Sequence, residues 1–218
     1  MGIVWLAIGI VSVCLVACVV LLAIRGLRRG PMDPVIPPAI TPQQANRDRG
    51  AAAKRTVHGM LVDRLPQPCY RVHRHVTIPA GGGAPAATID HVVVSRFGVF
   101  AVHTVSWSGL LEGDADADRW AQRIRTRFHL RDNPIPGTRR AAARLTEMLD
   151  LAPGSVHPVL CFAGHRVSFN KPMPPDVVRA DGLVDDIMSF HRPILTEEVV
   201  EGIDQVVGER SGNPDRWM

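Results

Sequence analysis

The residues whose chemistry most needs an explanation lie on two adjacent apolar segments. Residues 88–95 and 98–105 are both rich in β-branched side chains, and the short turn between them predicts a β-hairpin. Asp90 stands inside the first segment, where an unpaired carboxylate is costly. His103 of the second segment should face Asp90 across the hairpin, so the two side chains predict a buried ion pair or, alternatively, two ligands of a metal site.

The sequence of this hairpin contains two distinctive runs, Ile89-Asp90-His91-Val92-Val93-Val94 and Gly98-Val99-Phe100. With these runs the chain resembles the nuclease-related domain (NERD), a bacterial branch of the PD-(D/E)xK nuclease superfamily. That family carries Glu-x-Lys on the second strand, and here the two positions hold His103 and Val105. The resemblance implies the PD-(D/E)xK fold with a reaction centre in which these groups are replaced.

The resemblance continues on both sides of the hairpin, over roughly residues 50–163. Upstream, the family's Gly-x-x-Gly-Glu helix motif falls on Gly50-Ala51-Ala52-Ala53-Lys54, so that a lysine replaces the glutamate. Downstream, Trp120 matches a family tryptophan, and Asn133-Pro134-Ile135-Pro136-Gly137 matches an Asn-Pro-x-x-Gln step that has lost its glutamine. Of the polar metal-site set that the family implies, Asp90 alone is kept.

These replacements bear directly on the chemistry. Hydrolysis of a phosphodiester with Mg²⁺ needs converging carboxylates and a cation or base that activates water. Imidazole is a poor ligand for Mg²⁺, and a valine cannot replace a lysine. We therefore interpret Lys54, Asp90, His103 and Val105 as a vestigial site, and we expect no catalytic residue, no resident metal and no cofactor.

Three functions are compatible with this interpretation of the hairpin. The favoured one is a catalytically inactive binding or scaffold module, with a protein or a nucleic acid as its partner. An alternative is an active endonuclease that uses Mg²⁺ and relocated acids such as Glu112 or Asp114. A further alternative is a structural subunit of a membrane complex. The sequence shows no small-molecule site, and it identifies neither the partner nor the oligomeric state.

The formal net charge of +4 conceals two segments of opposite sign. Residues 116–145 contain eight arginines against three acids, whereas residues 176–209 contain nine acids against two arginines. The basic segment could contact phosphates, but two ordinary solvated faces are the favoured interpretation. The candidate nucleic-acid contacts are Arg123, Arg125, Arg127, Arg139 and Arg140.

Two further patterns only superficially suggest metal sites. Asp114, Asp116 and Asp118 alternate as a calcium loop begins, but Arg119 stands where that loop requires glycine. His73 and His75 have the spacing that places two ligands on one face of a strand. We expect a surface turn in the first case and an exposed sheet face in the second.

The amino-terminal segment predicts a membrane anchor. Residues 3–24 form an uncharged apolar run of 22 residues, about 33 Å long as a helix and sufficient for a bilayer core of about 30 Å. Arg25, Arg28 and Arg29 follow, so the positive-inside rule places the amino terminus outside and the remainder in the cytoplasm. We expect a single-pass protein of the inner membrane. Lipoprotein processing at Cys18, after Leu15-Val16-Ala17, is the alternative.

The whole chain of 218 residues then divides into four parts. These are an anchor with its basic flank (1–29), a proline-rich linker (30–40), a NERD-like domain (41–170) and a carboxy-terminal helical extension (171–218). Within them we predict helices over 41–65, 134–149 and 196–207, and strands over 70–78, 88–95, 98–105 and 156–163. The expected fold class is α/β (α+β), with a transmembrane helix followed by a mixed central sheet flanked by helices.

Overall fold

The computed structural model describes residues 41–81, 83 and 85–212. The predicted anchor at residues 3–24, its basic flank and the linker at 30–40 lie outside these residues. Among the helices that are described, none combines the length and the apolar character needed to cross a membrane. The contacts within the chain divide it after Thr41, and every helix and strand described below belongs to the unit Pro42–Met218.

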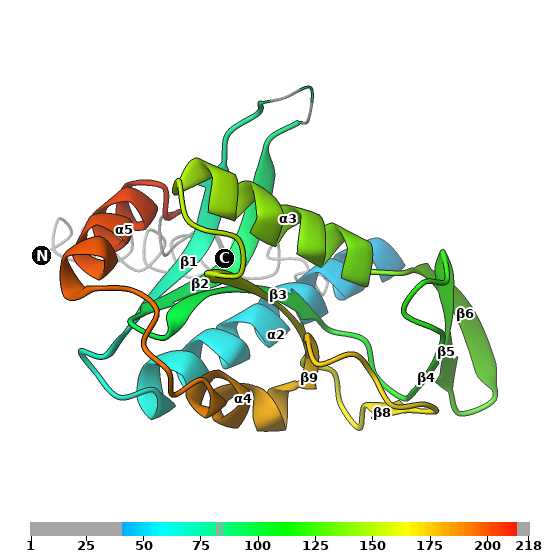
Figure 1. Ribbon diagram of the computed structural model, residues 1–218. Helices are drawn as coiled ribbons and strands as arrows, with labels where there is room; N and C mark the ends of the chain where they lie inside the picture. Colours follow the sequence, from blue (N-terminus) through cyan, green and yellow to red (C-terminus); the bar gives the residue numbers. More distant parts are fainter. Residues whose placement is uncertain (1–40, 82, 84, 213–218) are drawn as a thin grey trace, which may run out of the picture. The chain divides into compact units, whose positions relative to one another are not determined.

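Five strands form a mixed central sheet (Figure 1). They lie in the order β1 (Tyr70–Ile78), β2 (Ala87–Ser95), β3 (Gly98–Val105), β7 (Val156–Phe162) and β9 (Val177–Arg179). The first three pair antiparallel, whereas β3, β7 and β9 pair parallel. The long apolar runs of β2 and β3 explain their central position, because side chains on both faces of these strands are buried.

Helices cover both faces of this sheet (Figure 1). One face packs against α2 (Pro42–Arg64) and α4 (Leu183–Ser189), which share a core cluster with Val93, Phe100 and Val102. The other face packs against α3 (Ile135–Met148) and α5 (Glu197–Glu209), whose apolar side chains join Val92 and Val94. The predicted mixed sheet flanked by helices is therefore confirmed.

A second, smaller sheet was not predicted from the sequence. Its strands lie in the order β6 (Arg127–Asp132), β5 (Arg119–Ile124), β4 (Leu110–Glu112) and β8 (Ser168–Phe169). It packs against the domain through Trp120, which is fully buried and stacks on Phe162 with ring centroids 5.9 Å apart. Trp120 thus joins the core cluster between the two sheets.

Most predicted element bounds agree with the structure to within two residues. The hairpin of β2 and β3, the strand β1 and the helices α2, α3 and α5 are all confirmed. After residue 170 the chain forms α4 and α5, and it also forms β9, which extends the central sheet beside β7. The 3₁₀ turn Ala180–Gly182 joins β9 to α4.

The expectation that His73 and His75 lie on an exposed sheet face is wrong, because both side chains are half-buried. His75 has a backbone φ of 56°, which interrupts the regular alternation of β1. His73 instead lies 2.6 Å, Nε2 to Oδ1, from Asp204 of α5. The residues on either side of His75 consequently face different layers of the molecule.

Candidate functional site

Asp90 is the centre of the candidate site, and the residue is only 2% exposed. Its Oδ1 lies 2.5 Å from the Nζ of Lys54, which reaches it from α2. Its Oδ2 accepts a hydrogen bond of 2.8 Å from the backbone N–H of Thr104, and the Nδ1 of His103 lies 3.1 Å from the same oxygen. The structure thus forms the Asp90–His103 contact expected from the hairpin and adds the ammonium group of Lys54 to it.

A change of face in β1 and β2 makes this arrangement possible. Val72 and Val93 contact the core under α2, whereas Val76 and Ile89 belong to the core under α3 and α5. Alternate residues of a regular strand share one face, so both strands turn over between these positions. Asp90 lies at this turnover, and its carboxylate can therefore meet side chains from both α2 and β3.

The electrostatics of Asp90 are set by competing effects. Burial by itself would raise the pKa of its carboxyl group. The hydrogen bond and charge of His103 oppose that effect, and Lys54 adds to them, so that the pKa falls from 3.8 to about 2. Asp90 is therefore ionised at neutral pH, and its charge is compensated by side chains of the protein.

His91, next to Asp90, has a packing role. It is fully buried and stacks on His58 of α2 with ring centroids 5.6 Å apart, and within the described chain neither of its ring nitrogens has a hydrogen-bond partner. Burial lowers the pKa of His91 to about 4, despite the opposing charge of Asp90. The imidazole is neutral at pH 7 and does not supply a further cation to Asp90.

A pocket of about 290 Å³ opens on the α3 side of His103. Its lining is mostly small and apolar and consists of Ala87, Thr88, Ile89, Ala101, His103, Pro134, Gly137, Thr138 and Ala141. Gly137 stands at the position where the resembled family has glutamine, and no heavy atom lies within 4 Å of where its Cβ would be. Val105, in contrast, is buried in the cluster of Trp120 and does not line this pocket.

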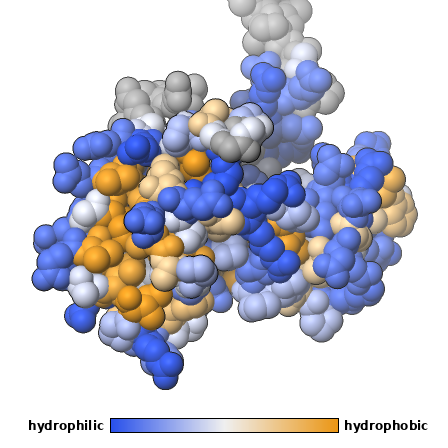
Figure 2. Space-filling model, turned by 45° about the horizontal axis from the view of Figure 1, so that its top comes forward, coloured by the Kyte–Doolittle hydropathy of each residue, from blue (hydrophilic) through white to orange (hydrophobic). Residues whose placement is uncertain are grey.

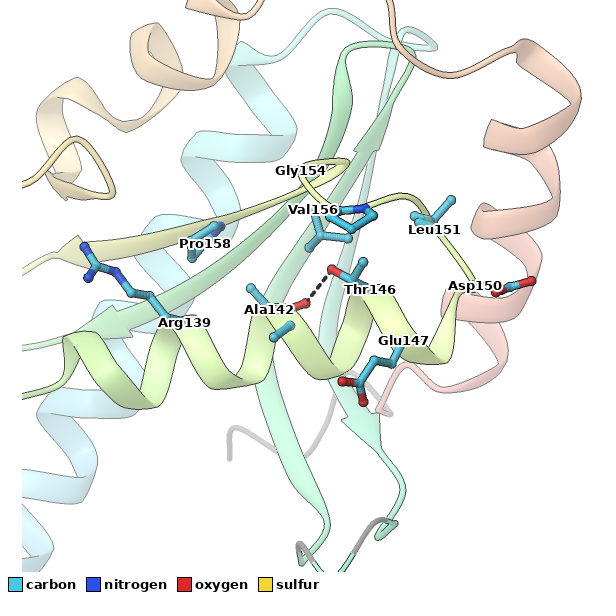
Figure 3. A pocket seen from close by; sticks show the side chains of 11 residues that line it. Arg139, Ala142, Thr146, Glu147, Asp150, Leu151, Gly154, Val156 and Pro158 are labelled. Atoms are coloured by element: carbon cyan, nitrogen blue, oxygen red, sulfur yellow. Dashed lines mark hydrogen bonds between the residues drawn. The ribbon is translucent and has the colours of Figure 1, made fainter.

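A second pocket, of about 560 Å³, runs between α3 and the beginning of β7 (Figure 3). Its wall consists largely of small and apolar residues such as Ala142, Val156 and Pro158, and the side chain of Glu147 points away from β7. The Oγ1 of Thr146 donates to the backbone oxygen of Ala142 at 3.0 Å, so this hydroxyl is already used within the helix. The pocket lacks the converging polar groups that a reaction centre needs.

The model of the nuclease-related domain matches residues 49–163, which is more than half of the chain. This chain belongs to the nuclease-related domain family. A curated uncharacterized protein of Bacillus anthracis is 34% identical over 87 residues, which make up 40% of this chain and 40% of that relative. The chain thus spans about two fifths of the length of the relative it matches. No solved structure matches the chain.

In the nuclease-related domain of this chain, the side chains around Asp90 are not suited to binding a Mg²⁺ ion. Mg²⁺ requires several oxygen ligands in near-octahedral geometry. Both oxygens of Asp90 already face nitrogen donors, and Lys54 brings positive charge to the position where the family supplies a glutamate. Among the described residues, no group of three His, Cys, Asp or Glu side chains is arranged to hold a metal ion.

The acids suggested as relocated ligands are engaged on the small sheet and its neighbouring turn. Glu112 of β4 lies 3.7 Å from the guanidinium of Arg123, and Asp114 pairs with Lys171 at 2.6 Å. Neither acid lines the pocket beside His103. These contacts offer no support for relocation.

The five candidate nucleic-acid contacts lie on separate elements. Arg123, Arg125 and Arg127 belong to the β5–β6 hairpin, whereas Arg139 and Arg140 are on α3. Arg139 donates two hydrogen bonds to Asp176, at 2.7 and 2.9 Å, and these bonds raise the pKa of its guanidinium. Phosphate binding by this set stays a prediction, which the pairing of Arg139 weakens.

Two contributors to the site were missed in the sequence. Thr104 follows His103 in β3, so its side chain faces the other way, yet its backbone N–H donates a hydrogen bond to Asp90. His58 stacks on His91 across the interface between α2 and the sheet. Backbone donors leave no trace in residue type, and the stacking depends on how α2 docks, so no local sequence signal identifies either contact.

Proposed function

We propose that this protein is a membrane-anchored, catalytically inactive nuclease-related domain that acts as a binding or scaffold module. The observation that carries the proposal is the contact of 2.5 Å between Lys54 and Asp90. The one acid retained from the family's metal site is neutralised by a lysine at the position of a family glutamate. A metal ion would have to displace that ammonium from a carboxylate with little access to water, and no second acid would compensate for it.

The surroundings of Asp90 also favour binding over hydrolysis. The pocket beside His103 has apolar walls, and Val105 lies in the core where the family has a lysine. Phosphoryl transfer depends on groups that stabilise developing negative charge, and such a wall stabilises it poorly. The protein therefore keeps the scaffold of a nuclease without the charge arrangement of one.

A protein partner is the occupant that the surface favours. Figure 2 shows hydrophobic residues gathered on the face where α3 and α5 lie. Ile194, before α5, and Val199, within it, are 45% and 40% exposed. Clustered exposed apolar side chains are typical of protein interaction sites, so we assign partner binding to this face.

Membrane anchoring rests on the apolar run at residues 3–24 and on the arginines that follow it. With this orientation the described domain lies at the cytoplasmic face of the inner membrane. The same anchoring would suit a structural subunit of a membrane complex, which differs from a scaffold only in its partner. Purification of the anchored protein with a defined membrane assembly would favour that alternative.

Metal binding and DNA cleavage test the inactive site together. We expect the fragment from Thr41 onward to bind no Mn²⁺ in a titration followed by electron paramagnetic resonance, and to leave plasmid and single-stranded DNA intact with Mg²⁺ or Mn²⁺. The comparison is a variant with Lys54→Glu and His103→Glu, which restores the family's two carboxylates beside Asp90. This variant should gain Mn²⁺ binding, because three carboxylates then converge.

The control for activity is Asp90→Ala, with circular dichroism used to verify that each variant is folded. Cleavage by the natural fragment that disappears in Asp90→Ala would contradict the proposal and revive the nuclease with relocated acids. Cleavage that persists in Asp90→Ala would arise elsewhere and would direct attention to Glu112 and Asp114.

A further inference from the structure

The β5–β6 hairpin carries the most exposed large apolar side chains in the described part of the chain. Phe128 and Leu130 of β6 are 65% and 62% exposed, and Ile124 at the end of β5 is 37% exposed. Figure 2 shows hydrophobic residues at the edge of the molecule on this side, apart from the area over α3 and α5. Transfer of such side chains out of water is favourable, which makes the hairpin a candidate contact surface.

The strand register places the two most exposed residues on the outer face of the small sheet. Phe128 pairs with Arg123 and Leu130 pairs with Ala121, so these four side chains point to one side. Trp120 and Gln122 of β5 point to the other side and are buried against the domain, whereas Ile124 and Arg127, which pair next to the turn, share that other side and are exposed. β6 is also the outermost strand of its sheet, so nothing in the described structure covers its free edge.

Positive charge surrounds the turn of this hairpin. Arg123, Arg125 and Arg127 occur within five residues, and no acidic residue lies between them. Arg123 is paired with Glu112, but among the described residues neither Arg125 nor Arg127 has an ion-pair partner. The hairpin thus combines apolar side chains with uncompensated cations, a combination that suits an anionic lipid surface.

The chain enters the domain beside this hairpin. Asn46 and Arg49, in the first turns of α2, line a pocket of about 230 Å³ together with Ile124 and Arg131 of the hairpin. Figure 1 shows the beginning of α2 at the end of the domain that carries β5 and β6. Residues 25–41 connect the apolar run to α2 and, at about 3.1 Å per residue in an extended proline-rich chain, reach at most roughly 50 Å.

We propose that the β5–β6 hairpin docks on the anionic surface of the membrane that holds the anchor. Phe128 and Leu130 enter the boundary between head groups and acyl chains, and Arg125 and Arg127 contact lipid phosphates. The proposal rests on the proposed anchoring, which holds the hairpin near the bilayer at high effective concentration. Docking would fix the orientation of the domain and leave the face of α3 and α5 available to a partner.

A nucleic acid fits the same surface less well. Binding of single strands relies on aromatic rings that stack on bases, and two of the three exposed apolar side chains here, Ile124 and Leu130, are aliphatic. Aliphatic side chains gain nothing from stacking, but they are well suited to lipid. The chemistry of the patch therefore selects lipid over bases.

The test uses the full chain reconstituted in nanodiscs of neutral phosphatidylcholine, with or without anionic phosphatidylglycerol, and with brominated acyl chains as quenchers. Phe128→Trp places a fluorophore in the patch, and each variant is compared with the natural chain in the same discs. Val62→Trp is the matched control, because Val62 is 43% exposed near the other end of α2. In anionic discs we expect the emission added at position 128 to shift to the blue and to be quenched, with no quenching at position 62.

Combining Arg125→Gln and Arg127→Gln with Phe128→Trp should lower the ratio of docked to undocked domain by about thirtyfold, since each basic residue near an anionic surface changes partitioning by about fivefold. Absence of quenching at position 128, or equal quenching at both positions, would overturn the proposal. Loss of the blue shift on addition of DNA would assign the patch to nucleic acid, and a blue shift that depends on protein concentration would assign it to a second copy; both results overturn lipid docking.

Failure of anchoring is seen separately, as a chain that does not elute with the discs. In that case vesicles of the same brominated lipids are added to the chain that is free of discs. Quenching at position 128 by these vesicles then tests docking independently of anchoring.

Discussion

Asp90 carries a full charge in a site with almost no access to water, and its neighbours explain why it stays charged. Lys54 and His103 compensate the carboxylate, and the N–H of Thr104 binds it as well. A buried ion pair of this kind adds little net stability, because desolvation offsets the attraction. Removal of Lys54 is different, since the buried carboxylate then keeps only His103 and the N–H of Thr104 as partners.

Lys54→Met tests this asymmetry while nearly keeping the volume of the side chain. We expect the free energy of unfolding at pH 7 to fall by about 3 kcal/mol in urea denaturation of the fragment from Thr41 onward. The double variant with Asp90→Asn should recover most of the loss, because an amide needs no countercharge. A double variant that loses the sum of the two single effects would show that the pair is not coupled.

The pH dependence of this variant follows from the sign of the Asp90 shift. In the natural chain the folded pKa, about 2, lies below the ordinary value of 3.8. The resulting stability is present above pH 3.8 and is lost as the pH falls toward 2. Without Lys54 the folded pKa should rise, so the stabilities of the variant and the natural chain should converge as the pH is lowered through this window.

At the scale of elements, local pattern predicts the central hairpin but not the small sheet. Two β-branched runs with a glycine turn define β2 and β3 from composition alone, because both faces of each strand are buried. In β6 the apolar residues Phe128 and Leu130 face solvent, and arginine and histidine occupy the alternate positions. Its pattern therefore does not reveal which face is inside. β9 has only three residues and depends on β7, which lies far away in the sequence.

In the candidate site, too, the contact within the hairpin was predictable from the sequence, whereas the contact that depends on tertiary packing was not. The Asp90–His103 contact follows from the register of one hairpin and was predictable. The Lys54–Asp90 contact depends on the docking of α2 and on the change of strand face at His75. The hydrophobic pattern of the sequence predicts neither feature. The matching family pattern placed Lys54 at the site, although residue spacing could not.

Gly109 tests how the small sheet is joined to the rest of the domain. Its φ is +84°, and a Cβ there would lie 2.3 Å from the backbone oxygen of Arg123 in β5. Gly109→Ala therefore combines backbone strain with a clash that no side chain can relieve, and it should destabilise the pairing of β4 and β5 by about 2 kcal/mol or more. Hydrogen exchange of peptides over residues 105–132 should accelerate by roughly thirtyfold or more.

The matched control for this glycine is Gly202→Ala in α5. No heavy atom lies within 4 Å of its Cβ position, and its backbone is helical. Alanine there should stabilise the helix by about 0.5–1 kcal/mol and leave exchange in the small sheet unchanged. Exchange that stays at the natural rate in Gly109→Ala would show that the loop can move aside.

At the scale of the whole molecule, the proposals depend on the side of the membrane on which the domain lies. A cytoplasmic domain would have an anchor at residues 3–24, a candidate lipid contact at the β5–β6 hairpin and a partner face at α3 and α5. These assignments share one requirement, which is that the basic flank and the domain that follows it lie on the cytoplasmic side of the membrane. A single measurement of topology therefore bears on all of them.

The cysteines of the chain provide the probe for this measurement. Cys69 is exposed, whereas Cys161 is buried, and burial raises the pKa of its thiol to about 12, so it does not react as a thiolate at neutral pH. Cys14 and Cys18 lie within the predicted span.

We expect a membrane-impermeant maleimide to leave the chain unlabelled in intact spheroplasts and to label it after permeabilisation. Cys69→Ser should abolish that labelling and so identify the site. Labelling of Cys69 in intact spheroplasts would place the domain outside and contradict the anchored cytoplasmic module, because the basic flank would then lie on the wrong side of the bilayer.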